Sequence, residues 1–190
     1  MTEGDEQGHS DLRRTIKATA ASPSQCSKMA ENSTLFHCLK EEGISVALTH
    51  DTLDARSIMD EVRSPKAGAI VLFAGTTRDS FDSKPVLHLS YESYPPLALQ
   101  TMLSIARAIR QKHSLTAITI IHRLGVVPIG EASVLIAVSA PHRQAAWKGG
   151  EEALEDVKEK VEIWKLEEFG GEEGGIWRAN RDGAAGCQSG

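Results

Sequence analysis

The sequence predicts an α+β domain in which helices pack against a mixed, mainly antiparallel sheet. Strand and helix patterns follow one another in the order strand, helix, strand, strand, helix, strand, strand, helix and a short last strand. This mixed order indicates an α+β sandwich with helices against one sheet. The 190 residues, of which 41% are hydrophobic, suffice for one such domain with its own core.

Both ends of the chain are expected to lie outside this domain. Residues 1–40 are rich in Ser, Thr, Glu, Lys and Gln, and they carry too few large apolar side chains to offset the entropy lost on ordering. Residues 181–190 are rich in glycine and alanine, as in a frayed terminus. We therefore predict a disordered N-terminal tail at 1–40, a domain at 44–180 and a flexible C-terminal tail at 181–190.

The first half of the domain shows three strand patterns and one helix pattern. Residues 44–48 alternate as in a half-buried strand, and Asp51 is expected to cap a helix that extends to position 62. GAIVLFAG, at 68–75, is an apolar run bounded by glycines and predicts a central strand. Residues 86–93 alternate again, and we expect this strand to pair with its predecessor.

The second half contains two long helical patterns separated by strands. The expected elements are a helix at 95–112, strands at 117–125 and 132–140, a helix at 142–161 and a short strand at 162–165. Gly149 and Gly150 interrupt the last helix, and each should cost about 1 kcal/mol relative to alanine. The pair therefore predicts either a kink or a packing constraint.

The overall charge excludes several classes of binding protein. A net charge of −5 and a pI near 5.8 argue against a general binder of nucleic acid or of anionic membranes. Proteins that bind such polyanions need an extended, positively charged surface. No stretch approaches the roughly 20 apolar residues of a membrane span. Any anion-binding site must therefore be local.

The cysteines and the N-terminal segment suggest a cytoplasmic protein. Cys26, Cys38 and Cys187 are odd in number and widely spaced, so they indicate neither a disulfide framework nor a zinc ribbon. The segment MTEGDEQGHS is acidic and has no apolar run, which argues against a secretory signal. We expect a soluble protein of the cytosol.

SAPHR, at 139–143, is a candidate anion site between a strand and a helix. Ser139 is expected to cap the helix and Pro141 to occupy its first turn, where backbone N–H groups and the helix dipole favour anions. His142 and Arg143 add hydrogen-bond donors at the same place. The alternative is an ordinary capped helix with an arginine facing solvent.

GTTRD, at 75–79, is a second candidate because it leaves a buried strand through a glycine. Arg78 would stand at the carboxyl end of that strand, a common position for residues that hold a phosphate or a carboxylate. The alternative is a surface turn in which Arg78 pairs with Asp79 or Asp82.

KEKVEIWK, at 158–165, is a third candidate, with Lys158 and Lys165 flanking a predicted helix-to-strand corner. Acidic residues outnumber lysines in this part of the chain, so both lysines are expected to be cations. The alternative is a run of solvated surface charges.

Other chemistries lack their sequence signatures. We find no phosphate-binding loop, no GxGxxG after a strand, no HExxH and no GxSxG. The seven histidines show no metal-ligand spacing, so neither a metal nor a cofactor is expected. His122, at a strand end beside Arg123, is interpreted as a structural histidine.

The candidate motifs together resemble a known family. GAIVLFAGTTRD, LSYESY, HRLG with VPIGEASVLIAVSAPHR, and KEKVEIWKLE occur in the order and at the intervals of the large, catalytic subunit of molybdopterin synthase. The resemblance covers about residues 44–180 and implies an α/β hammerhead-like fold. It implies a sulfurtransferase that converts cyclic pyranopterin monophosphate to the dithiolene of molybdopterin, in molybdenum cofactor biosynthesis.

The resemblance also implies partners. A small ubiquitin-like sulfur-carrier subunit would insert its Gly-Gly C-terminus, carrying a thiocarboxylate, and would supply the two sulfurs. The large subunits would form a homodimer within a heterotetramer. A regulatory scaffold that binds a ubiquitin-like partner or a nucleotide, and a different phosphate-ester enzyme, are the competing hypotheses.

Five basic residues match the family's site positions. The resemblance makes Lys158 and Lys165 the catalytic lysines, which also contact substrate, and it adds Arg78, His142 and Arg143 as substrate-binding residues. We expect all five side chains to converge on one cavity, where preorganised cations would stabilise the phosphate and the charge of the transition state.

Overall fold

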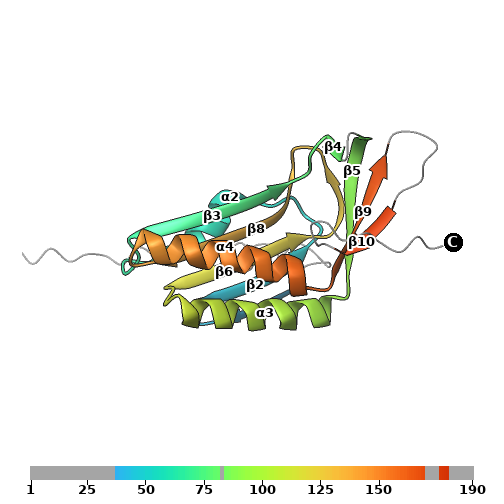
Figure 1. The fold of residues 1–190 in the computed structure, drawn as a ribbon. Coiled ribbons are helices and arrows are strands. Elements are labelled where there is room, and N and C mark those ends of the chain that lie inside the picture. Colours follow the sequence, from blue (N-terminus) through green and yellow to red (C-terminus); the bar gives the residue numbers. More distant parts are fainter. Residues whose placement is uncertain (1–36, 82–83, 170–175, 180–190) are drawn as a thin grey trace, which may run out of the picture.

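The structure is a computed structural model, and it describes residues 37–81, 84–169 and 176–179. Within these residues, two sheets and three helices pack against one another (Figure 1). The strands are β1 (His37–Glu41), β2 (Ile44–Thr49), β3 (Ala69–Thr76), β4 (Ser80–Phe81), β5 (Lys84–Ser93), β6 (Ala117–Arg123), β7 (Gly125–Pro128), β8 (Ala132–Ala140), β9 (Ile163–Phe169) and β10 (Ile176–Ala179). The helices are α2 (Ala55–Glu61), α3 (Pro95–Lys112) and α4 (Arg143–Lys160).

The first sheet has the strand order β1-β2-β6-β8-β3, and it is covered on both faces. Helices α3 and α4 lie on one face and α2 on the other (Figure 1). Because side chains alternate along a strand, Val46 of β2 belongs to the core under α3 and α4, whereas Ala47 belongs to the core under α2. Burial on both faces explains why β2 and β8 are buried along almost their whole length and contain no charged residue.

Only β2 and β6 pair in parallel, and every other strand pairing is antiparallel within the described residues. The predicted class, helices against a mixed and mainly antiparallel sheet, is therefore confirmed. The parallel pair requires a crossover between its strands, and the connection includes both α2 and α3.

Helix α4 runs without interruption through its two glycines. A Cβ atom at Gly149 would lie 3.0 Å from both methyl carbons of Leu115, and one at Gly150 would lie 3.4 Å from Val71 Cγ1. The glycines thus allow α4 to approach the first sheet and the end of α3 closely. Of the two expectations, a packing constraint is correct and a kink is not.

The second sheet has the strand order β10-β9-β5-β4, with β7 also paired to β5. It stands at the carboxyl end of α4 and beside one end of the first sheet (Figure 1). The long strand β5 places Tyr91 directly opposite Lys165 of β9 and opposite Gly125 of β7. This register decides which side chains face the first sheet.

The expected pairing of the strand at 86–93 with its predecessor is wrong. Strand β3 pairs with β8 in the first sheet, whereas β5 pairs with β4, β7 and β9 in the second. The chain between Thr76 and Ser80 therefore crosses from one sheet to the other. Alternation predicts which side chains share a face, but it does not identify the neighbouring strand.

The N-terminal boundary also differs from the prediction. Strand β1 begins at His37, inside the stretch expected to be a tail, and it pairs with β2. Cys38 of this strand is disulfide-bonded, which the cysteine spacing did not indicate. Residues 1–36 and 181–190 lie outside the described residues, as do most of the segments expected to be tails.

One smaller expectation is corrected as well. Helix α2 is capped by Asp54, whose carboxylate accepts a hydrogen bond from the Arg56 N–H, and not by Asp51. The sequence predicted no strand at the position of β10. In the part of the chain that the structure describes, no helix is long and apolar enough to span a membrane.

Substitution of the two glycines of α4 tests the packing explanation. Gly150→Ala is expected to stabilise the protein by about 0.5–1 kcal/mol, because its Cβ fits ordinary van der Waals contacts and alanine favours the helix. Gly149→Ala is the matched control, in which the 3.0 Å contacts with Leu115 offset that gain. Urea unfolding would measure both variants, and equal gains would contradict the packing constraint.

Candidate functional site

A cavity of about 540 Å³ lies at the carboxyl end of α4, between the two sheets. Both sheets and α4 contribute to it. Its apolar wall includes Phe73, Phe81, Leu89, Val134, Leu154 and Val157. Its charged lining consists of Arg78, Lys158, Lys165 and Glu167. Three cations that are distant in sequence therefore share one partly apolar cavity.

Arg78 stands at the exposed rim, on the loop that joins the sheets. The preceding residue, Thr77, is buried, and its hydroxyl donates a hydrogen bond to the Val127 carbonyl at 3.3 Å. After Arg78, the Asp79 carbonyl accepts a hydrogen bond from the Val86 N–H at 2.8 Å. The backbone is thus fixed on both sides of an arginine that reaches toward solvent.

Lys158 lies in the last turn of α4, where the helix dipole favours a cation. Leu154 and Val157 of the same helix also line the cavity, so the helix turns this face toward it. The close packing of α4 on the first sheet therefore determines where the Lys158 side chain begins.

Lys165 enters the cavity from β9 and is largely buried, with its side chain 14% exposed. Its Nζ atom lies 3.3 Å from Oε1 of Glu167 and 5.7 Å from the ring centre of Phe81. Glu167 is almost fully buried, so each charge depends on the other to offset the cost of desolvation. The Lys165 side chain is therefore held in the cavity by a buried ion pair.

No sequence motif singles out Glu167. It lies in an acid-rich segment, where one more glutamate indicates nothing. The usable signal was its spacing, because residues two apart on a strand face the same side. Once Lys165 is assigned to the cavity, the same spacing predicts that the Glu167 side chain also faces the cavity.

His122 and Tyr91 form the buried floor of the cavity. The His122 Nδ1 atom lies 2.8 Å from the Arg123 carbonyl oxygen, so Nδ1 carries the proton and donates it. Complete burial lowers the pKa of His122 to about 4, which keeps its ring neutral near pH 7. The structural interpretation of His122 fits this geometry, but the ring also lines the cavity.

His142 and Arg143 lie at the other end of α4 and do not reach this cavity. They line a second pocket, of about 700 Å³, together with Gln144, Trp147 and Lys148. Positions 143 and 158 are fifteen residues apart on the helix, which corresponds to about 22 Å along its axis. The expected convergence of five basic side chains within one chain is therefore wrong, and three of them converge.

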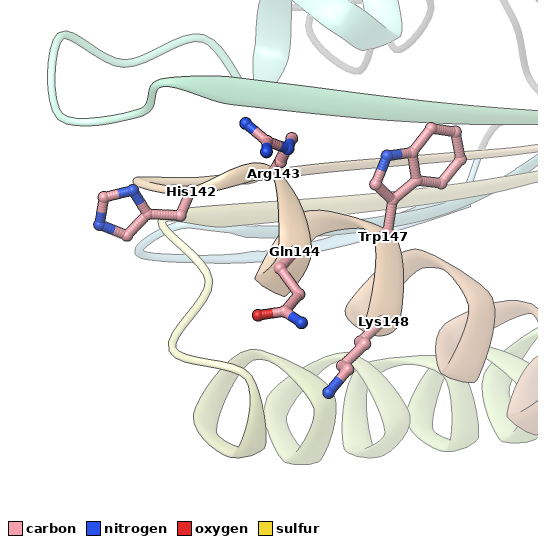
Figure 2. A pocket seen from close by; sticks show the side chains of 5 residues that line it. All are labelled: His142, Arg143, Gln144, Trp147 and Lys148. Atoms are coloured by element: carbon pink, nitrogen blue, oxygen red, sulfur yellow. The ribbon is translucent and has the colours of Figure 1, made fainter.

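The second pocket is an open surface built on the first turns of α4. Figure 2 shows Arg143 and Trp147 on one side of the helix, Gln144 and Lys148 on the other, and His142 directed away from the helix. All five side chains are exposed. These groups offer donors and an aromatic surface to a ligand, but they do not enclose one.

The predicted cap of α4 is also corrected. His142 occupies the N-cap position without a side-chain hydrogen bond, and Pro141 precedes the helix. Ser139 is a buried residue of β8. Among the described residues, no group of three or more His, Cys, Asp or Glu side chains could hold a metal ion.

Comparison with known proteins places this geometry in a family. The family model described as "MoaE protein" matches residues 48–160. The chain belongs to the MoaE family. Its matched region contains four of the five candidate residues, Arg78, His142, Arg143 and Lys158, and Lys165 follows shortly after it.

Relatives of this MoaE-family chain carry a consistent name. The molybdopterin synthase catalytic subunit of Sclerotinia sclerotiorum is 74% identical over 148 residues, which cover 78% of this chain and 76% of the relative. The protein of the same name from Neurospora crassa is 70% identical over 150 residues, covering 79% and 73%. The crystal structure of molybdopterin synthase from Staphylococcus aureus matches with a TM-score of 0.66 and 34% identity, covering 69% of this chain and 94% of that one.

The buried histidine of this MoaE-family chain predicts a pH dependence of stability. In the unfolded chain His122 gains a proton near pH 6.5, whereas in the folded chain its pKa is about 4. The unfolded state binds more protons in this window, so stability is complete above pH 6.5 and falls as the pH drops toward 4. The expected loss is about 3 kcal/mol.

Urea unfolding between pH 4 and 7 would measure this loss. His122→Asn is the control, because it removes the titrating ring and should flatten this part of the pH dependence. Parallel curves for the two proteins would contradict the assignment.

Proposed function

We propose that the chain is the catalytic subunit of a molybdopterin synthase, a sulfurtransferase of molybdenum cofactor biosynthesis. The observation that carries this proposal is the shared cavity of Arg78, Lys158 and Lys165. A cavity with fixed cations beside an apolar wall suits a ligand that has both a phosphate and a flat heterocycle. Cyclic pyranopterin monophosphate, the substrate that the family resemblance implies, has both.

The three cations would serve different parts of the reaction. Arg78, at the exposed rim, is suited to hold the phosphate through its planar guanidinium. Lys158 would act as general acid/base, or as an electrostatic stabiliser, beside the sulfur being transferred. Lys165, held by Glu167, would support the carboxylate of the donor tail.

The sulfur donor would be a small ubiquitin-like subunit with a Gly-Gly C-terminus that carries a thiocarboxylate. Glycines have no side chains, so such a tail can enter a narrow space between the sheets. In each transfer the thiocarboxylate sulfur forms a carbon–sulfur bond on the pterin side chain, and a carbon–oxygen bond breaks there, with its oxygen leaving as water or remaining on the opened phosphate. Water then hydrolyses the resulting thioester, which breaks the tail's carbon–sulfur bond and leaves an ordinary carboxylate on the tail. Two transfers complete the dithiolene, and both would take place in the cytosol.

His142 and Arg143 would belong to the site through a second copy of the chain. Helix α4 holds them about 22 Å from Lys158 along its axis, so one chain cannot bring all five residues to one ligand. A homodimer within a heterotetramer would allow the pair to face the partner's cavity. The pair would there add a bidentate arginine and a histidine to the substrate's anionic groups.

Removal of the Lys158 amine tests the proposed chemistry. We expect Lys158→Ala to lower the rate of sulfur transfer by about 10²–10⁴-fold while the protein remains folded, because a positioned general acid or base contributes about that much to a reaction rate. Lys160→Ala is the matched control, since Lys160 lies in the same helical turn, is exposed and pairs with Asp156 at 2.7 Å. The assay combines the protein, the thiocarboxylated small subunit and cyclic pyranopterin monophosphate, and it measures molybdopterin.

Other outcomes favour the competing hypotheses. Wild-type protein that binds the small subunit but forms no molybdopterin would indicate a regulatory scaffold. Turnover of phosphate esters without the small subunit would indicate a different enzyme. Normal turnover by Lys158→Ala would remove Lys158 from the mechanism.

Mixed dimers test the second-copy assignment. Arg143→Ala and Lys158→Ala are each expected to be inactive alone. If Arg143 acts on the partner's cavity, random co-assembly of the two variants restores about a quarter of the sites, because half of the dimers are mixed and each has one intact site. Mixtures that stay inactive, although mixed dimers form, would place Arg143 outside the partner's site.

A further inference from the structure

A ring contact joins the two sheets at the floor of the cavity. His122, near the end of β6 in the first sheet, packs edge-to-face against Tyr91 of β5 in the second. The ring centres lie 4.9 Å apart, with an angle of 70° between the planes. Both residues line the cavity, and His122 is fully buried while Tyr91 is 5% exposed. The contact therefore lies between the hydrophobic core and the charged side chains that line the cavity.

The His122 ring has a fixed orientation. Its Nδ1–H donates to the Arg123 carbonyl at 2.8 Å, at the point where β6 ends. The backbone is held there, because the Leu124 N–H donates to the Thr49 carbonyl at 2.7 Å and the Arg123 side chain pairs with Glu131. A ring held in this way has one fixed orientation relative to Tyr91.

Tyr91 in turn neighbours Lys165. The register of β5 and β9 places the two residues directly opposite each other, so their side chains leave the sheet on the same face about 5 Å apart. The Lys165 ammonium lies 3.3 Å from Glu167 Oε1 and above Phe81. The phenol ring therefore stands beside the lysine stem, and His122 packs against that ring.

We propose that His122 is a positioning residue, which holds Tyr91 in place and thereby fixes the path of the Lys165 side chain into the cavity. The consequence for catalysis rests on the proposed function, whereas the placement of Lys165 can be measured without it. Catalytic lysines need a defined geometry, and an aromatic ring with one rotamer restricts a flexible four-carbon stem. The competing explanation is that His122 only fills the core.

The test measures how exposed the Lys165 amine is. Limiting amounts of an amine-acylating reagent, followed by peptide mass spectrometry, report the labelling rate of Lys165 relative to the exposed Lys148. In the wild-type protein we expect slow labelling of Lys165. In His122→Asn, which keeps an N–H donor but loses the ring, we expect the relative rate to rise at least three-fold.

Tyr91 supplies a second pair of variants in case His122→Asn does not fold. Tyr91→Leu removes the ring and should raise Lys165 labelling as His122→Asn does, whereas Tyr91→Phe keeps the ring and should leave labelling within two-fold of wild type. Ile121→Ala is the control for general destabilisation. Ile121 precedes His122 on β6, is 2% exposed and faces the opposite core, under α2.

Kinetics provide the functional readout. We expect His122→Asn to lower kcat for sulfur transfer at least ten-fold with KM changed less than two-fold, and Ile121→Ala to leave kcat near wild type. Unchanged labelling of Lys165 in the folded His122→Asn and Tyr91→Leu variants would overturn the inference. Equal effects of Ile121→Ala on Lys165 labelling and on kcat would also overturn it. A wild-type protein without sulfur transfer would refute the proposed function, and the labelling experiment would still decide the position of Lys165.

Discussion

The pairing of β5 with β9 is the constraint on which the cavity depends. Side chains alternate along a strand, so a register slip of one residue would turn Lys165 and Glu167 away from the first sheet. The same register sets Tyr91 opposite Lys165. The buried Lys165–Glu167 pair reinforces the correct register, because the pair is tolerated only where each charge has its partner. Strand pairing and electrostatics thus specify the same arrangement.

Helix α4 completes the cavity from the other side. Its two glycines let the helix approach the sheet closely, and its last turn then delivers Lys158 where the dipole favours a cation. Cations gather in this cavity although the chain as a whole carries a net charge of −5. A local positive site on an acidic protein attracts one anionic ligand without attracting polyanions in general.

Sequence patterns predicted much of the fold and part of the site. The helices at 95–112 and 142–161, the apolar strands and the cations Arg78, Lys158 and Lys165 were all identifiable, because periodicity and motif order are local properties. The division into two sheets could not be predicted, because the alternation of side chains along a strand does not identify the strand beside it. Glu167 escaped notice among many acids.

The error over His142 and Arg143 has a different cause. Motifs indicate which residues belong to a site, but they carry no information about which copy of the chain supplies each residue. The length of α4 shows only that this pair and Lys158 cannot meet within one chain, because the two ends of the helix are too far apart to serve one ligand. A structure is therefore needed before residues with a shared function are assigned to a shared pocket.

A crystal structure of the protein with cyclic pyranopterin monophosphate bound would test the central claim most directly. We predict electron density for the ligand in the cavity between the sheets, with a phosphate oxygen within hydrogen-bonding distance of Arg78 and the carbons that accept sulfur beside Lys158. Density confined to a surface remote from Arg78, Lys158 and Lys165 would contradict it.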